Sequence, residues 1–311
     1  MGTGDLSSGE ATITLPVVRQ LIDTQFPRWA HLPLEPAPSQ GVDNATYRLG
    51  PELSVRLPRY ARWTGQVARE QEWLPKLAPH LPLPVPVPLA EGRPGAGYPF
   101  PWSVLRWLPG DAVDPDTGTA GELAGFFAAL QRIDATGGPQ PQWSNGFRGV
   151  AMTDERDSAI APARLAPRIE ALAGLIDLDA VAAVWEAARA APPWAGPPVW
   201  IHGDPAPGNL LAREGRVSAV IDFGTLAVGD PACDLIVAWS VLSAAERREF
   251  RAELDIDDAT WARGRGWGLT AVLPTRAELT GPTAARARRR LDELVADHRM
   301  PAVRHRAAEV R

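Results

Sequence analysis

The sequence contains only one cysteine, Cys233, in 311 residues. An internal disulfide is therefore excluded, and the paired cysteines of a zinc site are missing. Long apolar runs are also missing, because none reaches the roughly 18 residues that a membrane span requires. The amino terminus has neither the basic nor the apolar segment of a signal peptide. These absences predict a soluble cytoplasmic protein that does not interact with membranes.

Lysine is almost absent as well. Lys76 is the only one, so arginine supplies the other 31 of the 32 basic residues. Any role that usually belongs to a lysine must therefore belong to an arginine, whose planar guanidinium is not equivalent to an ammonium group. The net charge of −5 gives no indication of nucleic-acid binding.

The hydrophobic pattern divides the chain into two parts. Before Gly110, we expect a first helix at 11–26 that begins near Thr12 or Thr14, then two strands joined by a turn at Gly50-Pro51. A helix over 63–81, a proline-rich crossover and a strand over 102–108 complete this part. After Gly110 the pattern is mainly helical, with short strands between 199 and 223. The predicted helices of this second part are 119–135, 165–176, 178–191, 230–242, 244–254, 258–273 and 284–299.

The stretch "WIHGDPAPGNLLAREGRVSAVIDFG" at 200–224 carries the clearest chemical signal. Each of its tripeptides alone would indicate no more than a turn. Together they give His-x-Asp-x-x-x-x-Asn followed by Asp-Phe-Gly, the catalytic set of a kinase. Asp204 is the expected base, and Asn209 and Asp222 are the expected Mg²⁺ ligands, because this ion prefers oxygen donors. A hairpin with its turn at Glu214-Gly215 would bring the two ligands together.

With "GDPACDL" after them, these motifs resemble the aminoglycoside phosphotransferase family, which is similar in fold to eukaryotic protein kinases. The resemblance extends over roughly residues 15–275. It implies an α+β, bilobal protein-kinase-like fold, with a small β-rich nucleotide-binding lobe over 1–108. The larger, mainly helical lobe over 109–311 would hold the catalytic and acceptor sites. The implied reaction uses ATP or GTP with Mg²⁺ and phosphorylates a hydroxyl group of a small molecule.

The resemblance also implies a nucleotide site in the first part of the chain. Its loop would be at Gly41 and Asn44, its phosphate-contacting cation at Arg56, and the acidic partner of that cation at Glu70. Leu105 would line the adenine pocket, and backbone groups near Trp107 and Leu108 would hold the base.

The main departure from the family is Arg56, which stands where a lysine is expected. An arginine can also bind phosphate oxygens and pair with a carboxylate. Arg59 is the alternative cation and Glu72 the alternative acid. Arg56 is also the one feature that supports another reading, a kinase-fold binding protein without catalysis.

Several residues near the motif are expected to support it rather than react. We expect His202 to pack and hydrogen-bond within the loop, and Asp230 to cap the next helix ahead of Pro231. Asp234 would anchor the catalytic loop, as its equivalent does in kinase-like folds. Cys233 is expected to be buried, and "GRGWG" at 264–268 indicates close helix packing.

The acceptor is the least determined part of the prediction. An aminoglycoside is a polycation and would need carboxylates around its cleft, whereas the segment 281–311 holds eight arginines and four acids. Twelve tryptophans weakly favour a larger, partly apolar acceptor such as a macrolide. Solvated loop residues and helix caps are the alternative reading of the candidate acids. These candidates are Asp154, Glu155, Asp157, Glu253, Asp255, Asp257 and Asp258.

Overall fold

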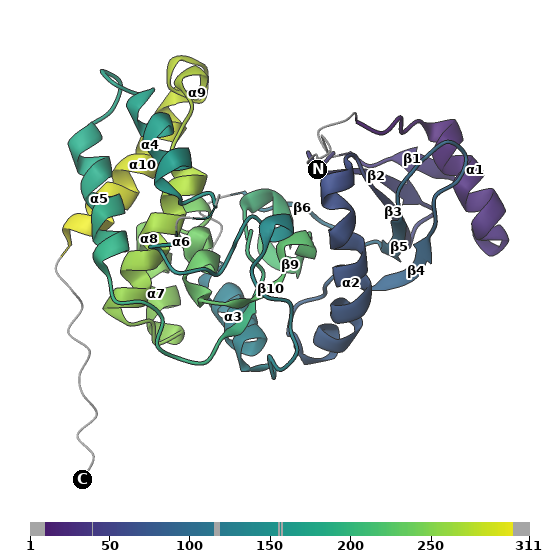
Figure 1. The fold of residues 1–311 in the computed structure, drawn as a ribbon, viewed down its shortest axis with the longest axis horizontal. Helices are drawn as coiled ribbons and strands as arrows, with labels where there is room; N and C mark the ends of the chain where they lie inside the picture. Colours follow the sequence, from purple (N-terminus) through teal and green to yellow (C-terminus); the bar gives the residue numbers. More distant parts are fainter. Residues whose placement is uncertain (1–9, 39, 115–118, 155, 157, 301–311) are drawn as a thin grey trace, which may run out of the picture.

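A computed structural model describes residues 10–38, 40–114, 119–154, 156 and 158–300. Its first part is a five-stranded antiparallel sheet in the order β1-β2-β3-β5-β4. Helix α1 lies on the side of this sheet that faces away from the second part, and α2 lies on the side that faces it (Figure 1). The strands are β1 (Leu34–Pro36), β2 (Asn44–Leu49), β3 (Leu53–Pro58), β4 (Pro88–Gly92) and β5 (Trp102–Arg106), and the helices are α1 (Leu15–Gln25) and α2 (Thr64–Leu77).

The apolar side chains of strands β2 and β3 are buried in the hydrophobic core of the first part. Leu49 pairs with Leu53 across the turn that was predicted at Gly50-Pro51, and Gly50 adopts a φ of +62° there. Helix α1 begins directly after Thr14, one of the two expected starts. Its buried residues Val18, Leu21 and Ile22 pack on the sheet in a separate small core.

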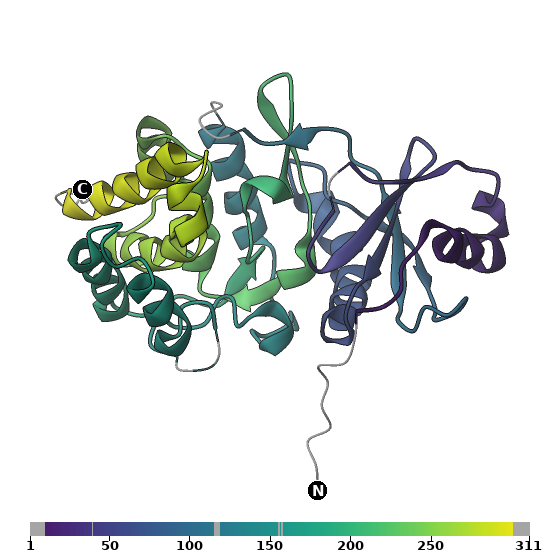
Figure 2. The same cartoon turned by 90° about the horizontal axis from the view of Figure 1, so that it is seen from above.

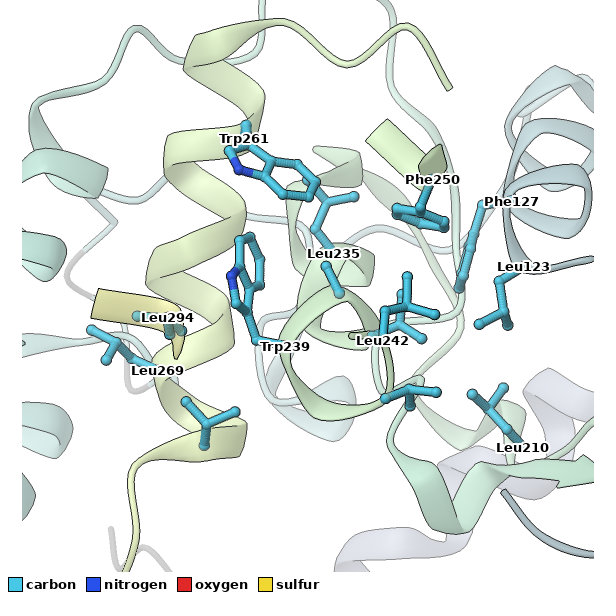
Figure 3. Close-up of a cluster of buried hydrophobic side chains, with 14 of the residues drawn as sticks. Leu123, Phe127, Leu210, Leu235, Trp239, Leu242, Phe250, Trp261, Leu269 and Leu294 are labelled. Carbon is cyan, nitrogen blue, oxygen red and sulfur yellow. The ribbon is translucent and has the colours of Figure 1, made fainter. Parts of the chain in front are cut away.

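The second part is built from helices around a larger hydrophobic core (Figures 1 and 2). Figure 3 shows the centre of this core, where the tilted rings of Trp239 and Trp261 lie with their centroids 4.8 Å apart and Phe127 packs edge-on against Phe250. The helices are α3 (Ala120–Arg132), α4 (Pro162–Glu170), α5 (Leu178–Ala190), α6 (Ile236–Ser240), α7 (Ala244–Glu253), α8 (Asp258–Val272), α9 (Arg276–Thr280) and α10 (Ala284–Arg299). The short strands are β6 (Asp111–Ala112), β7 (Val199–Ile201), β8 (Leu210–Arg213), β9 (Arg216–Val220) and β10 (Ala227–Gly229).

Three expectations about the elements were wrong. The segment 230–242 is not one helix: it starts as the 3₁₀ helix Pro231–Leu235 and continues as the short α6. The helix predicted over 63–81 ends at Leu77, and a 3₁₀ turn with Pro79 follows. The helix predicted over 165–176 starts earlier, at Pro162, and ends at Glu170. The proline-rich crossover is extended, as expected, and it contains an edge strand, β4, where prolines cost the fewest ladder hydrogen bonds. No helix in the described ranges is long and apolar enough to cross a membrane.

Helix α2 links the two parts of the molecule, and it lies between the sheet and the helical region in Figure 1. Its Arg69 donates to the carbonyl of Gly224 and, at 2.6 Å, to the hydroxyl of Ser144. Trp63, just before α2, stacks on Trp143 of the second part with ring centroids 6.2 Å apart. Helix α2 is therefore attached directly to the segment that contains Asp222.

The glycines of "GRGWG" lie where α8 touches its neighbours most closely, as the sequence indicated. A Cβ on Gly264 would lie 2.6 Å from Leu235, and one on Gly268 would lie 2.8 Å from Trp239. Gly266 faces another helix, because its Cβ would lie 2.6 Å from the Cβ of Ala188 in α5. Helix α8 is thus packed tightly on both sides.

Candidate active site

The hairpin β8–β9 places the two expected metal ligands side by side. Its two-residue turn is Glu214-Gly215, and both residues have positive φ, +53° and +76°, as a type I′ turn requires. At the open end of the hairpin, Ile221 donates its N–H to the carbonyl of Asn209 at 2.8 Å. Asn209 and Asp222 therefore lie at adjacent ends of paired strands, as the spacing in the sequence predicted.

A buried carboxylate holds the loop that carries Asp204. Asp234 accepts the N–H of His202 at 2.9 Å and that of Gly203 at 2.7 Å. Burial outweighs these hydrogen bonds and raises the pKa of Asp234 to about 6. His202 is fully buried, accepts the N–H of Asp204 on Nδ1 and contacts the carbonyl of Ile221 through Nε2. Both side chains thus support the loop, as expected.

Asp204 itself is open to solvent, with 40% of its side chain exposed. Its backbone carbonyl accepts the side-chain amide of Asn209 at 2.8 Å, which fixes the spacing between the two residues. The only cation within ion-pair distance among the described residues is Arg148, whose Nη2 lies 3.7 Å from Oδ1. The carboxylate is therefore accessible from the adjacent cleft.

Arg56 lies at the centre of an ion-pair network. Its Nη1 is 2.7 Å from the carboxylate of Glu70, and its Nη2 donates to Asp222. Burial opposes the ionisation of Asp222, but the neighbouring Arg56 outweighs it and lowers the pKa of this carboxyl group. Burial raises the pKa of Glu70, although Arg56 partly offsets the effect.

The two alternatives for this pair are engaged elsewhere. Arg59 binds Glu10 at 2.9 Å, and Glu72 binds Lys76 at 3.2 Å on an exposed face of α2. The geometry therefore favours Arg56 with Glu70 over either substitute.

The expected nucleotide-loop residues lie on the same side of the sheet as Arg56. Asn44 opens β2, is buried, and lies beside Gln66 of α2, at 3.2 Å between the two side-chain amides. Gly41 packs closely against Asn44, since a Cβ there would lie 3.3 Å from its carbonyl oxygen. Leu105 is buried in β5. Beyond β5, the N–H of Trp107 donates to the carbonyl of Glu52 at 2.7 Å, so an adenine contact would use the other backbone groups of Trp107 and Leu108.

The donor atoms present fit Mg²⁺ and not a metal with a protein cage. No group of three or more His, Cys, Asp or Glu side chains in the described ranges could hold a metal ion. What the hairpin offers is one amide oxygen at Asn209 and one carboxylate at Asp222, a side chain that is 40% exposed. One or two protein oxygens, completed by phosphate and water, is the coordination that Mg²⁺ takes with nucleotides.

A cleft of about 470 Å³ opens beside Asp204. Its lining comes from the loop before β8, from the end of α8 and from α4, α9 and α10. Four arginines line it, against two acids. These six charged residues are Arg148, Arg168, Arg286, Arg290, Asp204 and Glu278.

The acids that were expected to line an acceptor cleft are not among these residues. Asp154 pairs with Arg156, Asp257 caps α8 by accepting the N–H of Thr260 at 2.6 Å, and Asp258 pairs with Arg251. Asp255 and Glu253 are exposed and do not line the cleft. Glu155 and Asp157 lie outside the described residues. The alternative reading as caps and solvated residues is the correct one for the five described acids.

A second buried ion pair, between Asp230 and Arg263, was not predicted from the sequence. Asp230 caps the following 3₁₀ helix, as expected, by accepting the N–H of Ala232 at 2.9 Å. It also binds Arg263 of α8, with Nε 2.7 Å from Oδ2 and both side chains buried. Arg263 directly precedes "GRGWG", and in an arginine-rich chain the sequence alone does not distinguish it from the other arginines.

Comparisons with known proteins agree with this geometry. A family model described as "Phosphotransferase enzyme family" matches residues 36–267. An aminoglycoside 3'-phosphotransferase of Escherichia coli is 37% identical over 83 residues, which are 24% of this chain and 31% of that protein. The match therefore spans about a third of this relative's length.

Two solved structures share the architecture over most of the chain. The GDP complex of an aminoglycoside 2'-phosphotransferase-IIIa is 18% identical, with a TM-score of 0.61 and coverage of 90% of this chain and 98% of that one. A macrolide 2'-phosphotransferase from Brachybacterium faecium is 23% identical, with a TM-score of 0.59 and coverage of 93% and 100%. These likenesses establish the fold as the α+β, kinase-like arrangement that the sequence predicted.

Proposed function

Because the chain belongs to the phosphotransferase enzyme family, we propose that it phosphorylates a hydroxyl group of a small molecule at the cleft beside Asp204. In this reaction the hydroxyl oxygen forms a bond to the γ-phosphorus of a nucleoside triphosphate. The bond from that phosphorus to the β,γ-bridging oxygen breaks, and the nucleoside diphosphate leaves. The proton of the hydroxyl group passes to Asp204.

The observation that carries the proposal is the arrangement of three polar side chains around one hairpin end. Asp204 faces the cleft, and its backbone carbonyl is bonded to Asn209, which is adjacent to Asp222. Asn209 and Asp222 would hold Mg²⁺, which neutralises developing charge on the phosphate oxygens when it is bound. Arg56, held by Glu70, would bind a phosphate oxygen in place of the usual lysine.

The donor is proposed to be ATP or GTP. Structural relatives were solved with GDP, with ADP and with ATP. In this proposal Gly41 and Asn44 form the phosphate loop, and Leu105, Trp107 and Leu108 surround the base. The lobe boundary at residue 108 and a cytoplasmic location, where both triphosphates are available, belong to the same proposal.

Antibiotics are the first acceptors to test. Relatives of the same fold were solved with kanamycin, gentamicin and streptomycin, and another is a macrolide phosphotransferase. The similarity to the Escherichia coli enzyme supports testing aminoglycosides before macrolides. A binding protein without catalysis is disfavoured, because Asp204, Asn209 and Asp222 are all in place and Arg56 keeps the acidic partner that a lysine would have.

The test is phosphate transfer with the Asp204→Asn variant. Incubation with ATP or GTP, Mg²⁺ and an antibiotic panel should give a phosphorylated acceptor that mass spectrometry detects. We expect Asp204→Asn to lose transfer by about 10²–10⁴-fold, the usual contribution of a positioned acid or base, and to retain nucleotide binding. Asp179→Asn, an exposed change in the first turn of α5, is the matched control. Near-normal transfer by Asp204→Asn would disprove the assignment.

A further inference from the structure

The cleft beside Asp204 is unusual in its charge. Arg148, Arg168, Arg286 and Arg290 all line it, whereas the protein as a whole has a net charge of −5. The three arginines other than Arg148 come from α4 and α10, which Figure 1 shows together with α9 at one end of the helical part. The positive charge of this cleft in an acidic protein indicates the charge of the molecule that binds there.

The two acids of the cleft offset only part of this positive charge, since Glu278 interacts electrostatically with Arg168 and Asp204 with Arg148. Asp204 already lies 3.7 Å from Arg148. Glu278 is used as the cap of α9, where it accepts the N–H of Thr275 at 2.7 Å and its hydroxyl at 2.8 Å. A cationic acceptor would therefore meet four guanidinium groups, and only one carboxylate that is not already bound to a backbone N–H.

Two of the arginines have donor capacity to spare. In the described part of the chain, no hydrogen bond or ion pair engages Arg286, which is exposed on the first turn of α10. Arg168 donates to the carbonyls of Thr270 and Leu273 through Nη2 alone, at 3.5 and 3.3 Å. Arg290, one turn after Arg286, is held by the carbonyls of Trp239 and Ser240 and adds a fixed charge.

The start of α10 strengthens the same field. Thr283 makes no side-chain capping bond, and the first turn of this 16-residue helix contains no acid. The partial positive charge of the helix amino terminus therefore adds to the charge of Arg286. The Nε of Arg148, another residue of the cleft lining, is buried and has no hydrogen-bond partner among the described residues.

We propose that the acceptor is a hydroxyl compound with a carboxylate or phosphate group, which Arg168 and Arg286 bind while its hydroxyl group faces Asp204. This inference rests on the proposed function and names the acceptor class for the same site. Guanidinium groups bind both anions through paired N–H donors, so the cleft chemistry alone is common to the two. The cleft would therefore bind such an acceptor in preference to the polycations with which several relatives were solved.

The experiment uses sugars that share one frame and differ in charge. Titration calorimetry on the full chain would compare glucose, glucuronate, glucose 6-phosphate and glucosamine. We expect at least one anionic sugar to bind about 10-fold more tightly than glucose, since a hydrogen bond to a charged group contributes at least that factor. Glucosamine should bind more weakly than glucose. Added salt should lower the affinity for the anionic sugar more than the affinity for glucose. Preference for glucuronate would assign a carboxylate, and preference for glucose 6-phosphate a phosphate.

Variants locate the binding. The variants Arg168→Gln and Arg286→Gln should each bind the anionic sugar about 10-fold more weakly than the wild type, and both should bind nucleotide as the wild type does. Arg288→Gln is the control, because Arg288 is on the same helix and bonds the carbonyl of Leu175 but does not line the cleft. The inference is overturned if glucosamine or kanamycin binds best, if no anionic sugar binds, or if both cleft variants bind the anion as the wild type does. Phosphorylation of a cationic acceptor by an Asp204-dependent route would overturn it and leave the proposed function intact.

Discussion

Replacement of Gly266 by alanine should destabilise the protein, although alanine is the better helix former. The new methyl group would lie 2.6 Å from the Cβ of Ala188 and 2.4 Å from the Cε of Met152. Carbon atoms in contact are separated by about 3.5–4.0 Å, so α5 and α8 would have to move apart by about 1 Å. Overpacking costs about 1–3 kcal/mol, and the gain in helix propensity returns at most about 1 kcal/mol. We therefore expect a net loss of up to about 2 kcal/mol.

Urea unfolding followed by tryptophan fluorescence measures this loss. The control is Gly125→Ala in α3, where the residue is exposed and nothing lies within 4 Å of the added Cβ. That variant should gain about 0.5–1 kcal/mol, because only backbone entropy changes. The same substitution thus has opposite signs at the two positions. If Gly266→Ala were as stable as Gly125→Ala, the proposed close contact between α5 and α8 would be wrong.

Three other perturbations test the ion pairs and the buried acid. Arg263→Met should cost about 3–5 kcal/mol in urea unfolding by leaving Asp230 buried and unpaired, and Asp230→Ala added to it should cost little more. Arg56→Met should lower kcat/KM for the nucleotide about 10–100-fold, and Arg56→Lys should restore part of it by keeping a cation beside Glu70. The pKa of Asp234 is about 6 in the folded state, above its unfolded value of 3.8, so the folded state binds more protons between these two pH values. The contribution of Asp234 to the free energy of unfolding therefore falls by about 3 kcal/mol as pH rises from about 4 to about 6. Asp234→Asn should remove this pH dependence, and a difference between the two proteins that is constant over this window would contradict it.

The catalytic side of the site could be predicted because its geometry is local. Asp204, Asn209 and Asp222 lie within 19 positions of one another, and the two-residue turn at Glu214-Gly215 folds β9 back on β8. The register shifts between Leu211 and Ala212, but Ile221 still bonds Asn209 at the open end of the hairpin. A short span of chain therefore brings the two ligands together. The partner of Arg56 was harder to identify, because Glu70 and Glu72 are on the same helix and only burial separates them. The family pattern decided that choice, and the geometry agrees with it.

The acceptor side could not be predicted, because no local rule connects its parts. Arg148, Arg168 and Arg286 are separated by long segments and meet only through the packing of α4, α8 and α10. In a chain whose cations are nearly all arginine, three more arginines carry no signal. The acids that seemed suitable for a cation were chosen by type alone, and those described cap a helix, pair locally or are exposed to solvent. Residue type fixed the donor chemistry here, whereas the charge of the acceptor cleft depends on tertiary contacts. The sugar series therefore tests a property that belongs to the fold and not to the motif.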